Sequence, residues 1–177
     1  ARRLLEANAL YARSNDGAVA PEARDHARGQ ARETLQSVLR ARPDHPDALN
    51  LLGRLSLDEG DCGTAEELLE KALEADPESA QTLTNLGYHA LITEEPETAA
   101  NYFDHALERD RQSVTAFAGK AHAFKQQGAF DAAYLHYRRL LDCGCEWTSI
   151  YAGMLECTRN LQINTADQAL AQDAIRM

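Results

Sequence analysis

Residues 46–79 read PDALNLLGRLSLDEGDCGTAEELLEKALEADPES, with apolar and small residues at regular spacings. Leu49, Leu52 and Gly53 recur at spacings that place them on one face of a helix. Gly60 then interrupts the pattern. A second apolar stripe follows, made of Ala65, Leu68, Leu69, Ala72 and Leu73. Pro77 ends it by removing a backbone donor. The stretch therefore predicts two amphipathic helices joined by a tight turn.

The same pattern recurs twice at a period of 34 residues. The first recurrence places large and small residues at Leu83, Leu86, Gly87, Ala99, Phe103 and Ala106. The second gives Phe117, Ala121, Gly128, Ala133, Tyr137 and Leu140. One helix pair cannot bury both of its apolar stripes, so neighbouring pairs must stack and share a core.

Local signals set the expected ends of these helices. Thr64, followed by a Glu three residues later, has the pattern of a capping box and predicts the start of a second helix there. Ser79 and Ser113 each stand where they would cap the next first helix. In the middle repeat, Glu94 and Glu95 replace the turn glycine.

The two ends of the chain depart from the repeat. In residues 1–45, Pro21 suits the first turn of a helix whose stripe runs on to Arg42, about two turns longer than in the other pairs. In residues 148–177, a capping pattern at Thr165 precedes a thin stripe. That stripe consists of Ala166, Ala169, Leu170, Ala174 and Ile175. The sparse final stripe predicts that a neighbour covers it: a second copy packed end to end, another protein, or the continuation of a larger chain.

This repeating order of residues resembles that of the tetratricopeptide repeat family. In both, a large residue is followed by Leu-Gly, a second Gly, a small, an aromatic and a small residue, and finally Pro. The resemblance implies an all-α fold, a right-handed solenoid of antiparallel helix pairs. It would form a single array over residues 1–177. Its parts would be an atypical leading pair (1–45), three repeats (46–79, 80–113 and 114–147) and a degenerate final pair (148–177).

The same resemblance implies a scaffold that binds a peptide or protein segment in a concave groove lined by the first helices. The groove residues expected on this basis are Asn50, Arg54, Leu57, Thr84, Asn85, Tyr88, Leu91, Ile92, His122, Lys125, Glu156 and Arg159. Apolar side chains on a face that should meet water favour a contact site. The alternative is that Leu57, Leu91 and Ile92 pack between adjacent repeats. Tyr88 is the expected anchor contact, because aromatic residues dominate binding hot spots.

One subset of the family holds the terminal carboxylate of chaperone tails with Lys, Asn and Arg residues. Only Asn85 matches that set here. Asn50 and Arg54 occupy the first pair of clamp positions, and Thr115 and Gly119 the last pair. Recognition of chaperone tails is therefore not expected.

Net charge and hydropathy indicate which classes of partner are to be expected. The net charge is −10, which disfavours nucleic-acid binding because such binding requires neutralised phosphates. No apolar run is long enough to span a membrane, so no membrane partner is expected and the cytoplasm is the default. The charge is uneven: residues 46–79 hold ten acidic side chains, and residues 1–45 hold eight Arg against six acids. The acidic run is interpreted as a solvated helix face or, alternatively, as a docking patch.

No pattern in the sequence identifies a reaction. A phosphate-binding glycine loop, a zinc-protease helix and a serine nucleophile elbow are all missing from it. The four cysteines include one close pair, Cys143 and Cys145, whereas structural zinc sites usually show two pairs. Zinc or redox chemistry stays an alternative to ordinary thiols. We therefore expect no catalytic residue, no metal and no cofactor in this chain.

Two other roles remain open on the sequence alone. The chain could be a recruiting module of a larger enzyme, since bacterial methyltransferases, sulfotransferases and glycosyltransferases carry similar repeats. It could also be a secretion-type chaperone, because small acidic three-repeat proteins of that kind hold apolar segments of clients.

Overall fold

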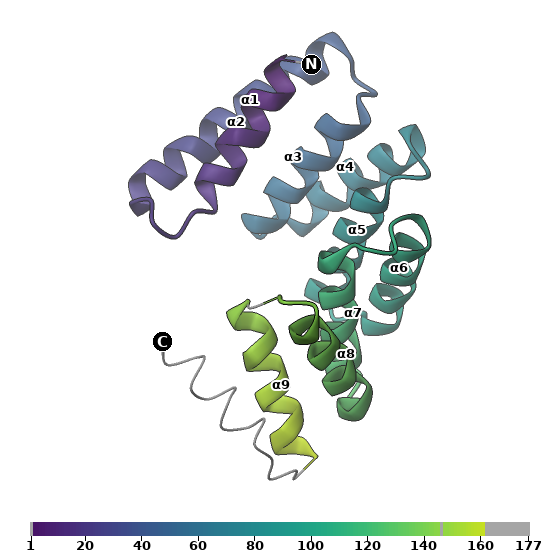
Figure 1. Ribbon diagram of the computed structural model, residues 1–177. Coiled ribbons are helices and arrows are strands. Elements are labelled where there is room, and N and C mark those ends of the chain that lie inside the picture. Colours follow the sequence, from purple (N-terminus) through teal and green to yellow (C-terminus); the bar gives the residue numbers. More distant parts are fainter. Residues whose placement is uncertain (1, 146, 162–177) are drawn as a thin grey trace. The chain divides into compact units, whose positions relative to one another are not determined.

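The computed structural model describes residues 2–145 and 147–161 (Figure 1). Within these residues the chain forms nine α-helices and no strand. The helices are α1 (Arg2–Ser14), α2 (Pro21–Ala41), α3 (Pro46–Asp58), α4 (Cys62–Ala75), α5 (Ala80–Ile92), α6 (Pro96–Arg109), α7 (Val114–Gln126), α8 (Phe130–Asp142) and α9 (Thr148–Asn160). The predicted all-α, helical-repeat fold class is confirmed.

The chain divides into two compact units, residues 1–85 and 86–177, and each is described by itself. In the first unit α1 packs on α2 and α3 packs on α4. In the second unit α6, α7, α8 and α9 each pack on the next. The predicted single array with its five parts stays a prediction. The expected capping pattern at Thr165 and the stripe after it lie outside the described residues.

The core of the first unit is built around the long helix α2. This helix begins at Pro21, whose missing N–H costs nothing in a first turn, and Glu22 complements the helix dipole. Leu35, on its buried side, is completely inaccessible to solvent. It belongs to a cluster with Ala7 of α1 and with Ala48, Leu51, Leu52 and Leu55 of α3. The leading pair is thereby joined to the pair that follows it.

The predicted helix starts differ in how well they match the structure. Helix α4 begins at Cys62, and the Asp61 side chain caps it by accepting from the Thr64 backbone N–H at 3.1 Å. The capping box at Thr64 is therefore wrong, since the carboxylate three residues earlier takes the orphan donor. Ser79 and Ser113 do cap, accepting from backbone N–H groups at 3.2 and 3.3 Å.

Three turns between paired helices share one backbone conformation. Gly60 and Gly128 have positive φ angles of 81° and 77°, and Glu94, at the equivalent position, has φ 62°. Glycine adopts this left-handed region without steric cost, whereas a side chain at Cβ is disfavoured there. The turn geometry is thus kept even where the glycine is not.

Glycines on the first helices leave room for aromatic rings in the second unit. The ring of Phe103 is fully buried. A Cβ atom built on Gly87 would lie 2.6 Å from it, and one built on Gly119 only 2.2 Å. Gly153 has the same relation to Tyr137, at 2.4 Å. These contacts explain the small residues as sites of close helix approach.

Candidate functional site

A row of polar side chains crosses the first helices of the first unit. Asn85 donates from Nδ2 to Asn50 Oδ1 at 2.8 Å. Its own Oδ1 accepts from the Arg54 guanidinium at 3.3 Å. Both asparagines are buried, at 4% and 5% exposure, while the Arg54 side chain keeps 34%. The paired amides therefore support a guanidinium that reaches the surface.

Two further residues complete this row. Asp58, one helical turn after Arg54, accepts from Arg54 Nε at 3.3 Å. Tyr11 of α1 donates its hydroxyl to the other oxygen of Asp58 at 2.7 Å. Burial raises the pKa of Tyr11, and the positive charge of Arg54 partly opposes this. The i,i+4 spacing of Arg54 and Asp58 could have predicted their pairing, whereas no spacing links either to Tyr11.

The apolar and hydroxyl residues of the predicted groove have different surroundings. Leu57 and Leu91 are buried, at 6% and 9% exposure, whereas Ile92 is 52% exposed. Thr84 donates its hydroxyl to the Ala80 carbonyl of its own helix at 2.7 Å. Leu57 and Leu91 thus have the burial expected if they pack inside the protein, and Ile92 does not. Their part in a binding groove stays a prediction.

Tyr88, the predicted anchor, is held from two sides in the second unit. Its hydroxyl donates to the Thr115 carbonyl at 3.0 Å. Its ring meets Phe103 edge to face, with centroids 5.3 Å apart. The side chain is half-buried, so the ring is fixed in place while part of it stays accessible.

A second polar cluster of the second unit joins His122, Lys125 and Glu156. Lys125 Nζ donates to Glu156 Oε2 at 2.6 Å. His122 Nδ1 lies 3.0 Å from the hydroxyl of the buried Tyr137, with the two rings edge to face. Arg159, the last predicted residue, is exposed. No sequence signal distinguished Tyr137, a core residue, as the partner of His122.

The pKa of His122 is lowered by burial and then by Lys125, and Glu156 partly opposes this. Burial is also the main cause of the raised pKa of Tyr137 and of a Cys157 pKa of about 11. The imidazole therefore stays neutral in the folded protein at neutral pH. At that pH both the phenol and the thiol keep their protons as well.

The buried imidazole makes stability depend on pH. An unfolded His has a pKa of about 6.5, so between that pH and the lower folded value the unfolded chain binds more protons. We expect the contribution of neutral His122 to the free energy of unfolding to be complete above a pH of about 6.5. This contribution should be lost as the pH falls from there through the lower pKa of the folded state. Urea midpoints between pH 8 and 5 should fall less steeply in His122→Gln than in the native protein. An NMR titration placing the imidazole pKa at or above 6.5 would contradict this.

The cysteines are free thiols. Cys157 is buried, Cys143 is exposed, and Cys62 and Cys145 are half-buried. Across residues 2–145 and 147–161, no three His, Cys, Asp or Glu side chains are grouped so that they could hold a metal ion. The arrangement in the described chain is one of fixed polar and aromatic contacts along the first helices.

The sequence pattern of the tetratricopeptide repeat matches this chain in three overlapping segments, residues 22–80, 52–113 and 84–144. The chain belongs to the tetratricopeptide repeat family. The matched segments contain α2 through α8, so both of the clusters described above lie largely on tetratricopeptide repeat (TPR) helices.

Solved TPR structures share the fold. The chain is 18% identical to pilF of Pseudomonas aeruginosa over 99% of this chain and 78% of that one, with a TM-score of 0.77. It is 18% identical to TTC0263, a thermophilic TPR protein of Thermus thermophilus, over 99% and 89% of the two chains, with a TM-score of 0.76. YrrB, a TPR protein with an unusual peptide-binding site, is 16% identical over 98% and 82%, with a TM-score of 0.65.

At these identities the similarity shows the fold alone. No curated protein matches the sequence. Among the described helices, none combines the length and the apolar character needed to cross a membrane.

Proposed function

We propose that this TPR chain is a non-catalytic scaffold that binds a segment of another protein along the first helices. The observation that carries the proposal is the amide pair Asn50–Asn85 beneath Arg54. Buried amides are costly unless they are paired, and apolar residues could fill the same positions. A polar pair kept at this place is explained by the guanidinium that it positions.

The chemistry of this site suits an extended peptide. A guanidinium binds carbonyl or carboxylate oxygens through planar N–H groups, and its fixed position lowers the entropic cost of binding. Asn50 accepts from Asn85 through its side-chain oxygen, so the N–H groups of its amide are the part of the side chain that can still donate to a carbonyl. The peptide oxygens of any segment could accept these bonds, and side chains would then select the partner.

The second unit offers contacts of another kind. Tyr88 is a rigid, half-buried ring, and Ile92 is an exposed apolar side chain at the end of α5. Lys125 and Glu156 form an ion pair, so they would set the orientation of a charged segment more than its affinity. A segment with apolar anchors beside acidic residues fits these contacts.

The proposal is tested with peptides selected against the native chain from a random display library. Arg54→Gln should weaken the binding of selected peptides by about ten-fold or more, measured by fluorescence anisotropy. Lys71→Gln is the matched control, because it removes the same charge from the exposed face of α4 in the same unit. Its affinity should stay within about two-fold of the native value.

A second variant separates binding from folding. Replacing both amides, Asn50→Leu with Asn85→Leu, removes donor and acceptor together, which is often close to neutral for stability. Peptide binding should be lost while the urea midpoint changes little. Native affinity in this double variant and in Arg54→Gln would exclude the first-helix face of the first unit as the binding site.

A further inference from the structure

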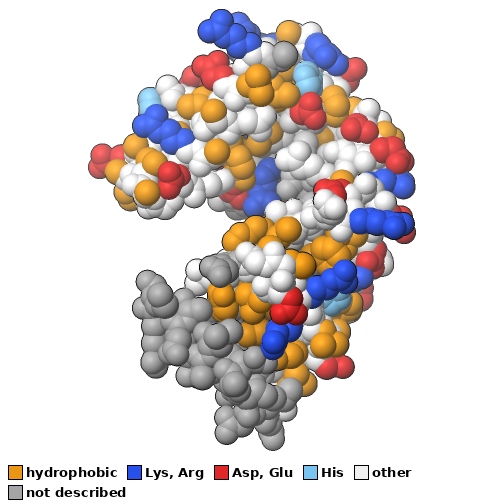
Figure 2. All heavy atoms as spheres, in the orientation of Figure 1, with side chains coloured by type: hydrophobic (Ala, Val, Ile, Leu, Met, Phe, Trp, Pro, Cys, Tyr) orange, Lys and Arg blue, Asp and Glu red, His pale blue; other side chains and the backbone are white. Residues whose placement is uncertain are grey.

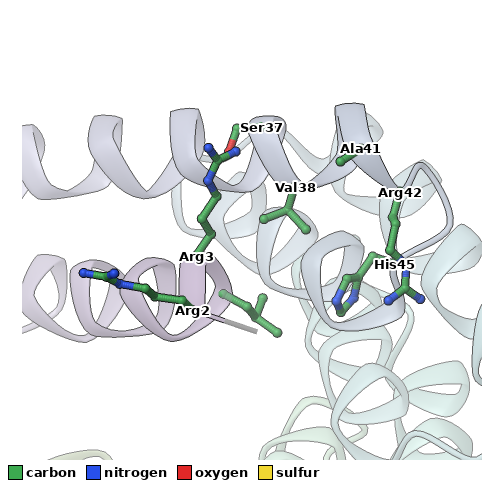
Figure 3. A pocket seen from close by; sticks show the side chains of 8 residues that line it. Arg2, Arg3, Ser37, Val38, Ala41, Arg42 and His45 are labelled. Atoms are coloured by element: carbon green, nitrogen blue, oxygen red, sulfur yellow. The ribbon is translucent and has the colours of Figure 1, made fainter.

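A cavity of about 270 Å³ opens at one end of the leading helix pair. Figure 3 shows it between the first residues of α1, the last turns of α2 and the loop that leads to α3. Its lining consists of Arg2, Arg3, Leu4, Ser37, Val38, Ala41, Arg42 and His45. None of these residues belongs to the first-helix contacts described above.

The lining is strongly basic. It holds three arginines and a histidine, with no Asp or Glu, in a chain of net charge −10. Figure 2 shows blue Lys and Arg side chains with a pale-blue His at the end of this unit where Figure 1 places the N-terminus. Three of the eight arginines of residues 1–45 thus line one concave site.

Two arginines, Arg3 and Arg42, flank the opening, whereas Figure 3 shows the side chain of Arg2 extending along α1 away from it. Arg3 donates from Nη1 to Ser37 Oγ at 3.2 Å, and Figure 3 shows its side chain crossing toward α2. Arg42 lies on the other side, next to His45. In the described part of the chain, neither Arg2 nor Arg42 forms an ion pair. An anion in the opening would be attracted by the positive charges of the arginines that line it.

His45 adds an independent indication of a ligand. Its Nδ1 atom is buried and has no hydrogen-bond partner. A buried polar atom without a partner has lost its hydrogen bonds to water without gaining others, which is unfavourable. Such atoms are uncommon in native proteins. Figure 3 shows the imidazole in the same opening as the Arg42 guanidinium. An oxyanion there could bind both groups.

The size and the apolar wall select the ligand further. Pockets for drug-sized molecules usually exceed about 300 Å³, so this one suits the end of a side chain. Leu4 and Val38 provide an apolar wall against which methylene groups can pack. We propose that this basic pocket binds the carboxylate of a glutamate in an acidic segment of a partner protein.

A comparable cavity beside α7 and α8 explains why the carboxylate site is proposed for the leading pair. A cavity of about 230 Å³ there is also lined by two arginines and His136, whose Nδ1 is likewise buried without a partner. However, the guanidinium of Arg139 lies 5.1 Å from the ring centre of Phe117. A cation stacked on an aromatic face is already engaged. The arginines of the leading pair have no such ring among the residues that line their pocket.

The test uses the whole chain and a fluorescein-labelled peptide that contains a run of glutamates between glycine and serine residues. Arg3→Gln combined with Arg42→Gln should weaken its binding at least ten-fold in fluorescence anisotropy. Arg13→Gln combined with Arg40→Gln is the matched control. It removes the same charge from exposed positions of the same terminal region, outside the pocket. Its Kd should stay within two-fold of the native value.

The peptide with glutamine in place of glutamate should not bind, and binding should weaken as salt is raised. Asn50→Leu with Asn85→Leu should bind the glutamate peptide normally, which distinguishes this site from the first-helix face. Equal losses in the two arginine pairs would reduce the effect to general charge attraction and overturn the proposal. So would unchanged binding in Arg3→Gln with Arg42→Gln, or equal affinity for the glutamine peptide.

Discussion

Phe103→Ala is expected to lower the free energy of unfolding by about 3–5 kcal/mol, the cost of removing a large buried aromatic side chain. Phe103 is completely buried, and its ring lies against the backbones of Gly87 and Gly119. The two glycines have no side chains that could move into the vacated space, and the Tyr88 ring that also borders it is held by its hydrogen bond to Thr115. Most of the cavity should therefore persist, which places the cost toward the upper end of the range.

Urea denaturation followed by the fluorescence of Trp147, the single tryptophan and part of the same unit, measures this loss. Leu135→Ala is the control, because Leu135 is 67% exposed on α8. It should change the unfolding free energy by no more than about 0.5 kcal/mol. A loss below about 1 kcal/mol for Phe103→Ala would mean that neighbouring helices close over the space.

In the first unit, Leu35→Ala is expected to cost about 2–5 kcal/mol. Leu35 is fully buried in the middle of α2, where it contacts the cluster shared by α1, α2 and α3. Its removal opens a gap among residues from three helices at once. Circular dichroism during urea denaturation measures the change in the midpoint.

Leu5→Ala is the matched control in the same helix pair. Its side chain is 70% exposed, so the same deletion removes little packing and should change stability by no more than about 0.5 kcal/mol. Equal destabilisation by both changes would place the core of the leading pair elsewhere.

The fold was predictable because each helix carries its own period. Apolar spacing located the helix pairs, and the breaks predicted at Gly60 and Pro77 follow the ends of α3 and α4 in the structure. The exact start of α4 was not predictable from the capping pattern. Asp61 and Thr64 both fit an N-cap, and only the backbone decides which one accepts the bond.

Contacts between helices were harder to predict than the helices. Phe103 and Tyr137 stand 34 residues apart, and so do Gly119 and Gly153, the glycines that accommodate their rings. One period earlier, Leu69 stands at the position of Phe103, and Asn85 stands at the position of Gly119. An aromatic residue in one repeat is thus matched by a glycine in the next, a dependence that no single helix reveals.

The candidate site was predicted in part. The helical period identified the face that holds Asn50 and Arg54, but a face says nothing about what covers it. Leu57 and Leu91 are consequently buried although they lie on that face. The basic pocket was missed for a related reason, since its lining joins the start of one helix, the end of the next and a loop.

The turn at Glu94 has a consequence for detecting such repeats. The left-handed conformation there costs a residue other than glycine on the order of 1 kcal/mol, a penalty that a well-packed helix pair can absorb. The glycine at this position can therefore be replaced during evolution while the turn keeps its conformation. A search pattern that insists on glycine at this site would overlook the repeat between residues 80 and 113 and would undercount repeats in divergent chains.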